Sequence, residues 1–99
     1  MIHLTQENFD DAIARQKSFV VFGAAWCGYC RVMEPVIEEI AAIYVRRVQV
    51  AKVDADVETA LVARFGITIF PTFLVFERGV EVNRTFGAKT LEELEQMIG

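Results

Sequence analysis

Two cysteines separated by two residues carry the strongest chemical signal in this sequence. Cys27 and Cys30 are the only cysteines among the 99 residues, and they flank Gly28 and Tyr29. A disulfide between them would close a very small loop and so would constrain the unfolded chain little. We therefore expect the pair to be reactive rather than structural, because two thiols at this spacing can interconvert between a dithiol and a disulfide.

A pair of cysteines can also be half of a metal site. Structural zinc takes about four ligands, and the chain adds only one histidine, His3, far from the pair in sequence. We expect His3 to be an ordinary strand residue, and we expect no metal and no cofactor. Two thiolates could still bind Cu(I), with Met33 as the nearest further sulfur, so a soft-metal site stays open as an alternative.

The position of the pair in the chain indicates how its two members differ. Residues 18–22 are apolar without polar alternation, which predicts a strand covered on both faces, and a helix is expected to follow over residues 28–45. The free N–H groups and positive dipole end of that helix would stabilise a thiolate on Cys27. We expect Cys27 to be partly exposed and to act as the nucleophile. Cys30, one turn into the helix, should be more buried and should resolve the mixed disulfide.

The rest of the chain alternates strand and helix patterns. Apolar residues at helical spacing predict an inward stripe on the long helix at Val32, Val36, Ile40 and Ile43, and Pro35 should kink it. Thr90 and Glu93 have the form of a capping box. The expected strands are 2–4, 18–22, 48–53, 70–77 and 80–86, and the expected helices are 6–15, 28–45, 57–64 and a last one from 91. This order predicts an α/β fold: a central mixed sheet of four to five strands flanked by about four helices, in one domain over residues 1–99.

Composition limits the partners of the chain. The net charge is −4, and no cluster of Lys and Arg occurs, which argues against nucleic acid and anionic membranes as partners. No apolar run reaches the ~18 residues that a bilayer span needs, and the N-terminus lacks the pattern of a secretory signal. We expect a cytoplasmic monomer, although an exported domain whose leader had been removed would have the same sequence.

Several segments resemble the thioredoxin family. Residues 25–31, Ala-Trp-Cys-Gly-Tyr-Cys-Arg, resemble the active-site segment of that family. Further matches follow in family order at Pro35, 51–54, 65–72, 76–79 and 86–88. The resemblance implies the thioredoxin fold and a thiol–disulfide oxidoreductase that most simply reduces protein disulfides. Its partners would be disulfide-containing proteins and, as electron donor, a flavoprotein of the thioredoxin reductase type.

The same resemblance assigns supporting residues around the cysteines. It implies that Pro71 is cis and lies beside Cys27, and that the peptide at Phe70 offers backbone hydrogen bonds to a substrate. Trp26 and Gly87 would line the same substrate groove. From the residue itself, Gly28 is expected to allow a tight start to the helix and to keep the approach to Cys27 open.

Two positions depart from the family pattern. Val21 stands where thioredoxins carry a buried aspartate that is thought to help deprotonate the second cysteine, so Lys52 would lack its usual partner. Water, the Cys27 thiolate or another carboxylate could take over the proton. Tyr29 replaces a proline and so restores a backbone N–H that could favour the Cys27 thiolate. Two other functions stay open: an oxidase or isomerase of an oxidising compartment, and a thioredoxin-fold module that binds a soft metal or a partner.

Overall fold

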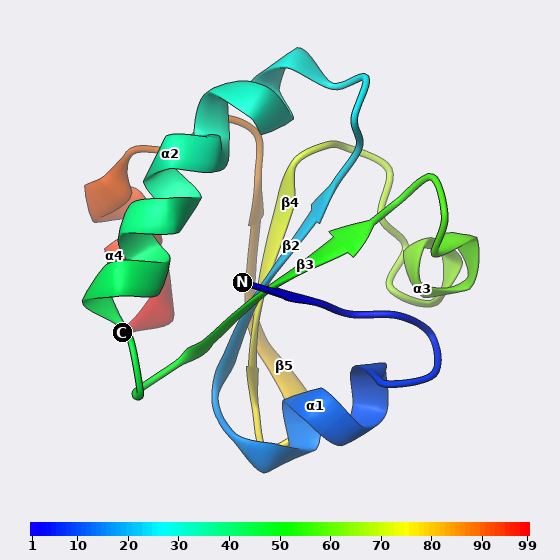
Figure 1. Ribbon diagram of the computed structural model, residues 1–99, viewed down its shortest axis with the longest axis horizontal. Coiled ribbons are helices and arrows are strands. Elements are labelled where there is room, and N and C mark those ends of the chain that lie inside the picture. Colours follow the sequence, from blue (N-terminus) through cyan, green and yellow to red (C-terminus); the bar gives the residue numbers. More distant parts are fainter.

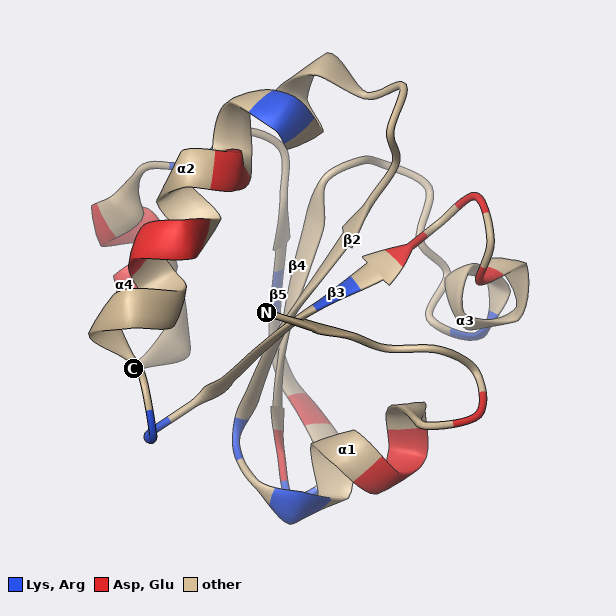
Figure 2. Cartoon of the chain, viewed as in Figure 1, with Lys and Arg blue, Asp and Glu red and all other residues tan.

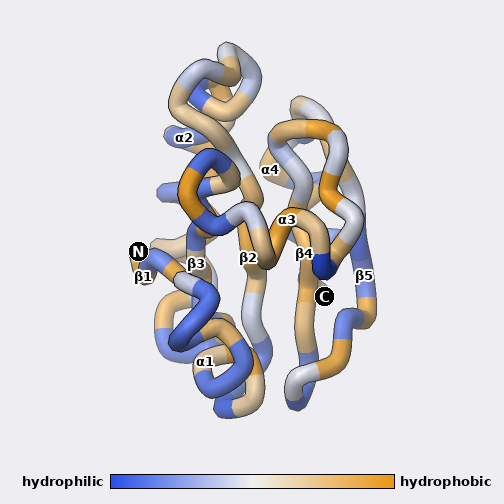
Figure 3. The backbone as a smooth tube through the Cα atoms, turned by 90° about the vertical axis from the view of Figure 1, so that its right-hand side faces the viewer, coloured by the Kyte–Doolittle hydropathy of each residue, from blue (hydrophilic) through white to orange (hydrophobic).

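Apolar residues on both faces of the central strands divide the structure into three layers. The computed structural model describes residues 1–99. In β2 (Ser18–Gly23), Phe19 and Val21 join one buried cluster, while Val20 and Phe22 join the other. β4 (Thr72–Glu77) alternates in the same way, because successive side chains of a strand point to opposite faces. Both strands are therefore covered on both sides, and β4 is coloured as hydrophobic over most of its length in Figure 3.

The sheet has five strands in the order β1-β3-β2-β4-β5. β1 (Ile2–His3), β3 (Gln49–Asp54) and β2 are parallel, whereas β4 and β5 (Val80–Phe86) form an antiparallel hairpin beside β2. The hairpin turns at Arg78 and Gly79, both with positive φ. The predicted mixed sheet and its helix complement are confirmed.

Two helices cover each face of the sheet (Figure 1). α2 (Gly28–Ile43) and α4 (Leu91–Ile98) lie on one side, and α1 (Phe9–Arg15) and α3 (Thr59–Arg64) lie on the other. The predicted capping box is present at α4: Thr90 Oγ1 accepts the Glu93 N–H, and the Glu93 carboxylate accepts the Thr90 N–H. α2 continues through Pro35 without ending.

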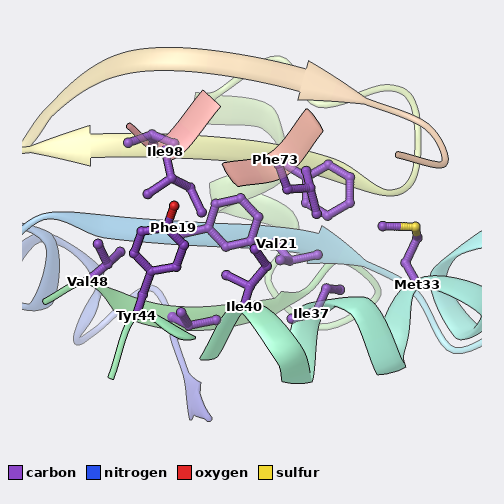
Figure 4. Packing of buried hydrophobic residues seen from close by; sticks show 12 residues of the cluster. Phe19, Val21, Met33, Ile37, Ile40, Tyr44, Val48, Phe73 and Ile98 are labelled. Atoms are coloured by element: carbon purple, nitrogen blue, oxygen red, sulfur yellow. The ribbon is translucent and has the colours of Figure 1, made fainter. Parts of the chain in front are cut away.

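The apolar stripe of α2 agrees only in part with the predicted one: Ile40 is buried and Val36 is partly buried, as expected, but the two ends of the stripe differ. Its buried residues are Met33, Ile37 and Ile40, which point toward Phe19 and Val21 of the sheet (Figure 4). Val32 and Ile43 are exposed, so their assignment to the inward face is wrong. Alternative apolar residues at 33 and 37 fit a helical period equally well, and only the sheet decides which stripe it covers.

Several element ends also differ from the predicted ones. α1 begins at Phe9 rather than residue 6, because Thr5 N–H donates to the Asn8 side chain and holds residues 5–8 in a turn. β4 begins at Thr72, which leaves Phe70 and Pro71 outside the sheet. α2 ends at Ile43, and α3 begins at Thr59.

Charged residues of both signs are spread over the helices and the ends of the strands (Figure 2). The four ion pairs are Arg15–Asp11, Lys17–Glu77, Arg64–Asp10 and Arg84–Glu81. None of them lies next to the cysteines. No helix combines the length and the apolar character that crossing a bilayer requires.

Candidate active site

The sheet register brings the two halves of the candidate site together. β2 and β4 are antiparallel neighbours, and Phe22 near the end of β2 is paired with Thr72 at the start of β4. The chain that leaves β2 toward Cys27 and the chain that arrives from Phe70 and Pro71 therefore meet at one edge of the sheet. The loop after β2 and the beginning of α2 lie at this edge in Figure 1.

Cys27 is the N-cap of α2. Its Sγ accepts the backbone N–H of Cys30 at 3.2 Å, which satisfies one of the free donors of the first helical turn. The thiol also donates to the carbonyl oxygen of Phe70, with 3.6 Å between sulfur and oxygen. A thiolate at this sulfur would keep the Cys30 N–H as a charge-assisted donor. The start of α2 was predicted to stabilise a Cys27 thiolate, and it does place a hydrogen-bond donor, the Cys30 N–H, on this sulfur.

The predicted difference in exposure between the cysteines is wrong. Cys27 is only 6% exposed, whereas Cys30 is partly exposed. The Phe70 carbonyl covers Cys27, while Cys30 lines a cavity on the other side of the loop. The sequence placed Cys30 inside the helix correctly but could not show that this part of the helix faces a hollow.

The environment of the Cys30 thiol changes its pKa. Desolvation by burial and the hydrogen bond between the two thiols raise the pKa of Cys30 to about 11. Cys30 therefore keeps its proton near neutral pH. The thiolate is the nucleophile in disulfide exchange, so a protonated Cys30 is poorly suited to a first attack on a substrate.

Trp26 and Pro71 are connected to Cys27 through Phe70, whose carbonyl accepts a hydrogen bond from the Cys27 thiol. The Phe70–Pro71 peptide bond is cis, as the resemblance implied. The Trp26 ring meets the Phe70 ring edge to face, with centroids 5.8 Å apart, and its Nε1–H donates to Asp56 Oδ1 at 3.0 Å. Gly87, with φ of 83°, donates its N–H to the Pro71 carbonyl at 2.8 Å. These contacts connect the four predicted groove residues to one another and, through the Phe70 carbonyl, to Cys27, although Pro71 is buried.

Gly28 and Tyr29 differ from what the sequence suggested. A Cβ at Gly28 would meet no atom within 4 Å, and this glycine does not have a positive φ. The tight helix start therefore does not depend on glycine, although its lack of a side chain leaves the approach open. Tyr29 is exposed, and the donor to Cys27 Sγ is the N–H of Cys30 rather than that of Tyr29.

Comparison with known proteins agrees with this geometry. The thioredoxin family model matches residues 1–99. The chain belongs to the thioredoxin family. It is 41% identical to the thioredoxin of Alicyclobacillus acidocaldarius over 96 residues, which cover 96% of this chain and 91% of that protein.

Two other thioredoxins show similar coverage. The chain is 37% identical to that of Chlamydia muridarum over 96% of its own length and 92% of the relative. It is 35% identical to that of Staphylococcus saprophyticus over 99% and 94%. With Cys27 and Cys30 adjacent at the helix start, this member of the thioredoxin family is a thiol–disulfide oxidoreductase.

The position that departs from the thioredoxin pattern lies against the second cysteine. Val21 is paired with Lys52 in the β2–β3 register, and both line a cavity of about 160 Å³ together with Cys30. Lys52 is half-buried and belongs to none of the ion pairs.

Sequence reasoning missed four polar residues near the site. His3, Glu34 and Asp54 line the cavity, and Asp56 holds the indole of Trp26. The spacing of four between Cys30 and Glu34 was visible in the sequence, since such residues share a helix face. The other three depend on strand order and on a loop. No three His, Cys, Asp or Glu side chains come together closely enough to hold a metal ion.

Proposed function

We propose that this protein reduces disulfides in other proteins, with Cys27 as the nucleophile and Cys30 as the resolving cysteine. The observation that carries the proposal is the hydrogen bond from the Cys30 N–H to Cys27 Sγ at the start of α2. That donor stabilises negative charge on Cys27 both as the attacking thiolate and as the sulfur displaced when the protein is reduced again.

The first step joins the protein to its substrate. The Cys27 thiolate attacks one sulfur of the substrate disulfide, and a bond forms between Cys27 and that sulfur. The second substrate sulfur leaves as a thiolate and takes a proton from solvent. The groove formed by Trp26, Phe70, Pro71 and Gly87 would hold the substrate segment, because it combines an exposed indole with backbone groups outside the sheet.

The second step releases the substrate. The Cys30 thiol loses its proton, and its sulfur attacks Cys27. A Cys27–Cys30 disulfide forms while the bond from Cys27 to the substrate breaks, so two electrons pass from the protein to the substrate. The raised pKa of Cys30 makes the loss of this proton a demanding part of the step.

Membership of the family implies disulfide substrates and a reductase as electron donor. We propose more specifically that a flavoprotein of the thioredoxin reductase type reduces the Cys27–Cys30 disulfide, and that residues 1–99 act as one domain in a cytoplasmic monomer. The net charge of −4 supports this proposal, since it does not favour nucleic acid or anionic lipid as a partner, and residues of both signs are spread along the chain in Figure 2.

Trapping of the mixed disulfide tests the assignment. Reduced Cys30→Ser protein, mixed with a disulfide-containing protein such as insulin, should accumulate a covalent complex that a thiol reductant dissolves. Cys27→Ser protein should form none, and both variants should lose turnover. If Cys27→Ser instead traps the complex, or if an alkylating reagent near neutral pH labels Cys30 before Cys27, the roles are reversed.

A further inference from the structure

The cavity next to Cys30 contains charged groups that the two-step reaction above does not yet use. It opens between the start of α2 and the ends of β2 and β3, and β1 contributes to its rim. Its volume of about 160 Å³ has room for several waters, since one water needs about 30 Å³ in the liquid. The polar side chains that line it are His3, Cys30, Glu34, Lys52 and Asp54.

The β2 side of this cavity cannot accept a proton. Val21 is buried and apolar, and Gly23 has no side chain. A Cβ at Gly23 would lie 3.4 Å from Cys30 Sγ, so the sulfur lies close to the backbone of β2. A cavity side chain that takes the Cys30 proton must therefore come from α2, β3 or β1.

The geometry favours Glu34 among those groups. Glu34 follows Cys30 by four residues on α2, a spacing that places two side chains on the same face of a helix with Cβ atoms about 5–6 Å apart. Helical side chains lean toward the N-terminus, so the Glu34 carboxylate leans toward the turn that holds Cys30. The carboxylate is exposed and has neither a hydrogen bond nor an ion pair within the protein, so it is free to accept a proton.

The other groups around the cavity are less suited to this task. Asp54 is paired with Gly23 in the β2–β3 register, but its Oδ1 accepts the Asp56 N–H at 3.0 Å and so is held by its own loop. His3 lies on the edge strand β1, which β3 separates from β2. Lys52 contributes a cation without an ion-pair partner, which attracts a carboxylate to the same cavity.

We propose that Glu34 accepts the proton of Cys30, through water in this cavity, when Cys30 attacks the mixed disulfide at Cys27. The Cys30 S–H bond breaks and its proton reaches the Glu34 carboxylate. The sulfur electron pair forms the bond to Cys27, and the substrate sulfur leaves as a thiolate. Lys52 draws the Glu34 carboxylate toward the cavity. This role rests on the function proposed above. It assigns the proton acceptor to a carboxylate on α2, whereas position 21, where thioredoxins carry an aspartate, holds valine in this chain.

The two steps can be timed separately with a small aromatic disulfide. Dithiobis(nitrobenzoate) releases one coloured thiolate when Cys27 attacks and a second when Cys30 resolves the adduct. In stopped-flow mixing with the reduced protein, the first phase depends on reagent concentration and the second does not. Recording both phases from mildly acidic to mildly alkaline pH gives the pH profile of each step.

Glu34→Gln should slow the second phase by about tenfold or more near neutral pH. A positioned base raises the rate of a step by about 10²–10⁴-fold, and water in the cavity would supply part of that acceleration in the variant. The first phase should not change. The second phase of this variant should become steeply dependent on pH, while Glu34→Asp should recover part of the rate. Glu38→Gln is the matched control: it removes the same charge from the next turn of α2, outside the cavity, and should leave both phases unchanged.

Each contrary outcome has a distinct meaning. If the wild type shows two phases and Glu34→Gln has an unchanged second phase, the role of Glu34 is overturned while the function stands. The same holds if Asp54→Asn slows the second phase and Glu34→Gln does not, or if Glu34→Gln and Glu38→Gln slow it equally. A wild type that never releases the second thiolate would overturn both the role of Glu34 and the proposed function.

Discussion

The backbone N–H of Cys30 and the Sγ of Cys27 lie 3.2 Å apart, so the second cysteine donates a hydrogen bond to the first before any chemistry begins. The bond uses the third residue of α2, where helical N–H groups have no partner within the helix. It ties the reactivity of Cys27 to the geometry of the helix start rather than to the side chains of Gly28 and Tyr29.

Replacing Tyr29 with proline should therefore change the reduction potential only slightly. The substitution removes an N–H that does not bond to Cys27 Sγ and leaves the Cys30 donor in place. One full charge-assisted hydrogen bond contributes about 1.5–3 kcal/mol, and ~30 mV corresponds to ~1.4 kcal/mol for this couple. We expect Tyr29→Pro to lower the potential by less than about 30 mV, measured against glutathione buffers.

Tyr29→Ala is the matched control for that measurement, because it removes the aromatic side chain and keeps the N–H. Its potential should equal that of the parent. If the reduction potential of Tyr29→Pro falls by clearly more than ~30 mV while that of Tyr29→Ala does not, the Tyr29 N–H does act on the Cys27 sulfur.

The second prediction concerns the hydrogen bond between Trp26 and Asp56. The indole N–H donates to the carboxylate across two loops that are distant in sequence, so it fixes the ring that borders the proposed groove. Asp56→Ala should lower kcat/KM for a protein disulfide a few-fold. The free energy of unfolding should fall by less than about 1 kcal/mol, since the contact is exposed. Asp56→Asn keeps an acceptor and should retain most of the activity.

Insulin reduction measures the loss in Asp56→Ala, and the fluorescence of Trp26, the only tryptophan, reports the freed ring. A small aromatic disulfide should react with Cys27 at the parental rate in both variants. An equal loss with the small and the large disulfide would place the effect on the cysteines rather than on substrate docking.

The fold could be predicted from sequence because its signals are local. Apolar strands alternate with helix patterns, and the Thr90–Glu93 capping box and the turn at Arg78 and Gly79 act within a few residues. The buried stripe of α2 could not be predicted, since both Val32 and Met33 begin apolar series at helical spacing. Only packing on Phe19 and Val21 selects Met33, Ile37 and Ile40.

The candidate site divides in the same way. The cysteine pair is a short motif that was visible in the sequence, whereas the cis bond before Pro71 was expected only from the resemblance to the thioredoxin family. The greater burial of Cys27, the link from Trp26 to Asp56 and the cavity next to Cys30 arise where β2, β3 and the segment before β4 meet. These contacts join residues about 20–50 positions apart in the chain, which propensity and periodicity do not relate.

Paired substitutions on α2 test which stripe is buried. Ile37→Ala removes a buried side chain that belongs only to the observed stripe and should lower the free energy of unfolding by about 2–5 kcal/mol. Val32→Ala, at a position 67% exposed, should change it by no more than about 0.5 kcal/mol. Urea denaturation of both variants provides the comparison, and a Val32→Ala loss as large as that of Ile37→Ala would restore the stripe first suggested by the sequence.

The stability of the reduced protein at alkaline pH should report the environment of Cys30. Burial raises the pKa of this thiol from 9.0 to about 11 in the folded state. As pH rises past about 9, the unfolded chain releases the Cys30 proton first, so the folded state binds more protons than the unfolded one. The contribution to stability is therefore fully present below pH ~9 and is lost as pH rises through about 11.

Urea denaturation with a phosphine reductant should show the free energy of unfolding of the parent falling more steeply across this window than that of Cys30→Ser. The two proteins differ only at position 30, so the difference between the two curves isolates Cys30. Parallel curves would mean that folding does not hold the proton on this sulfur, and the second step of the reaction would then need no special proton acceptor.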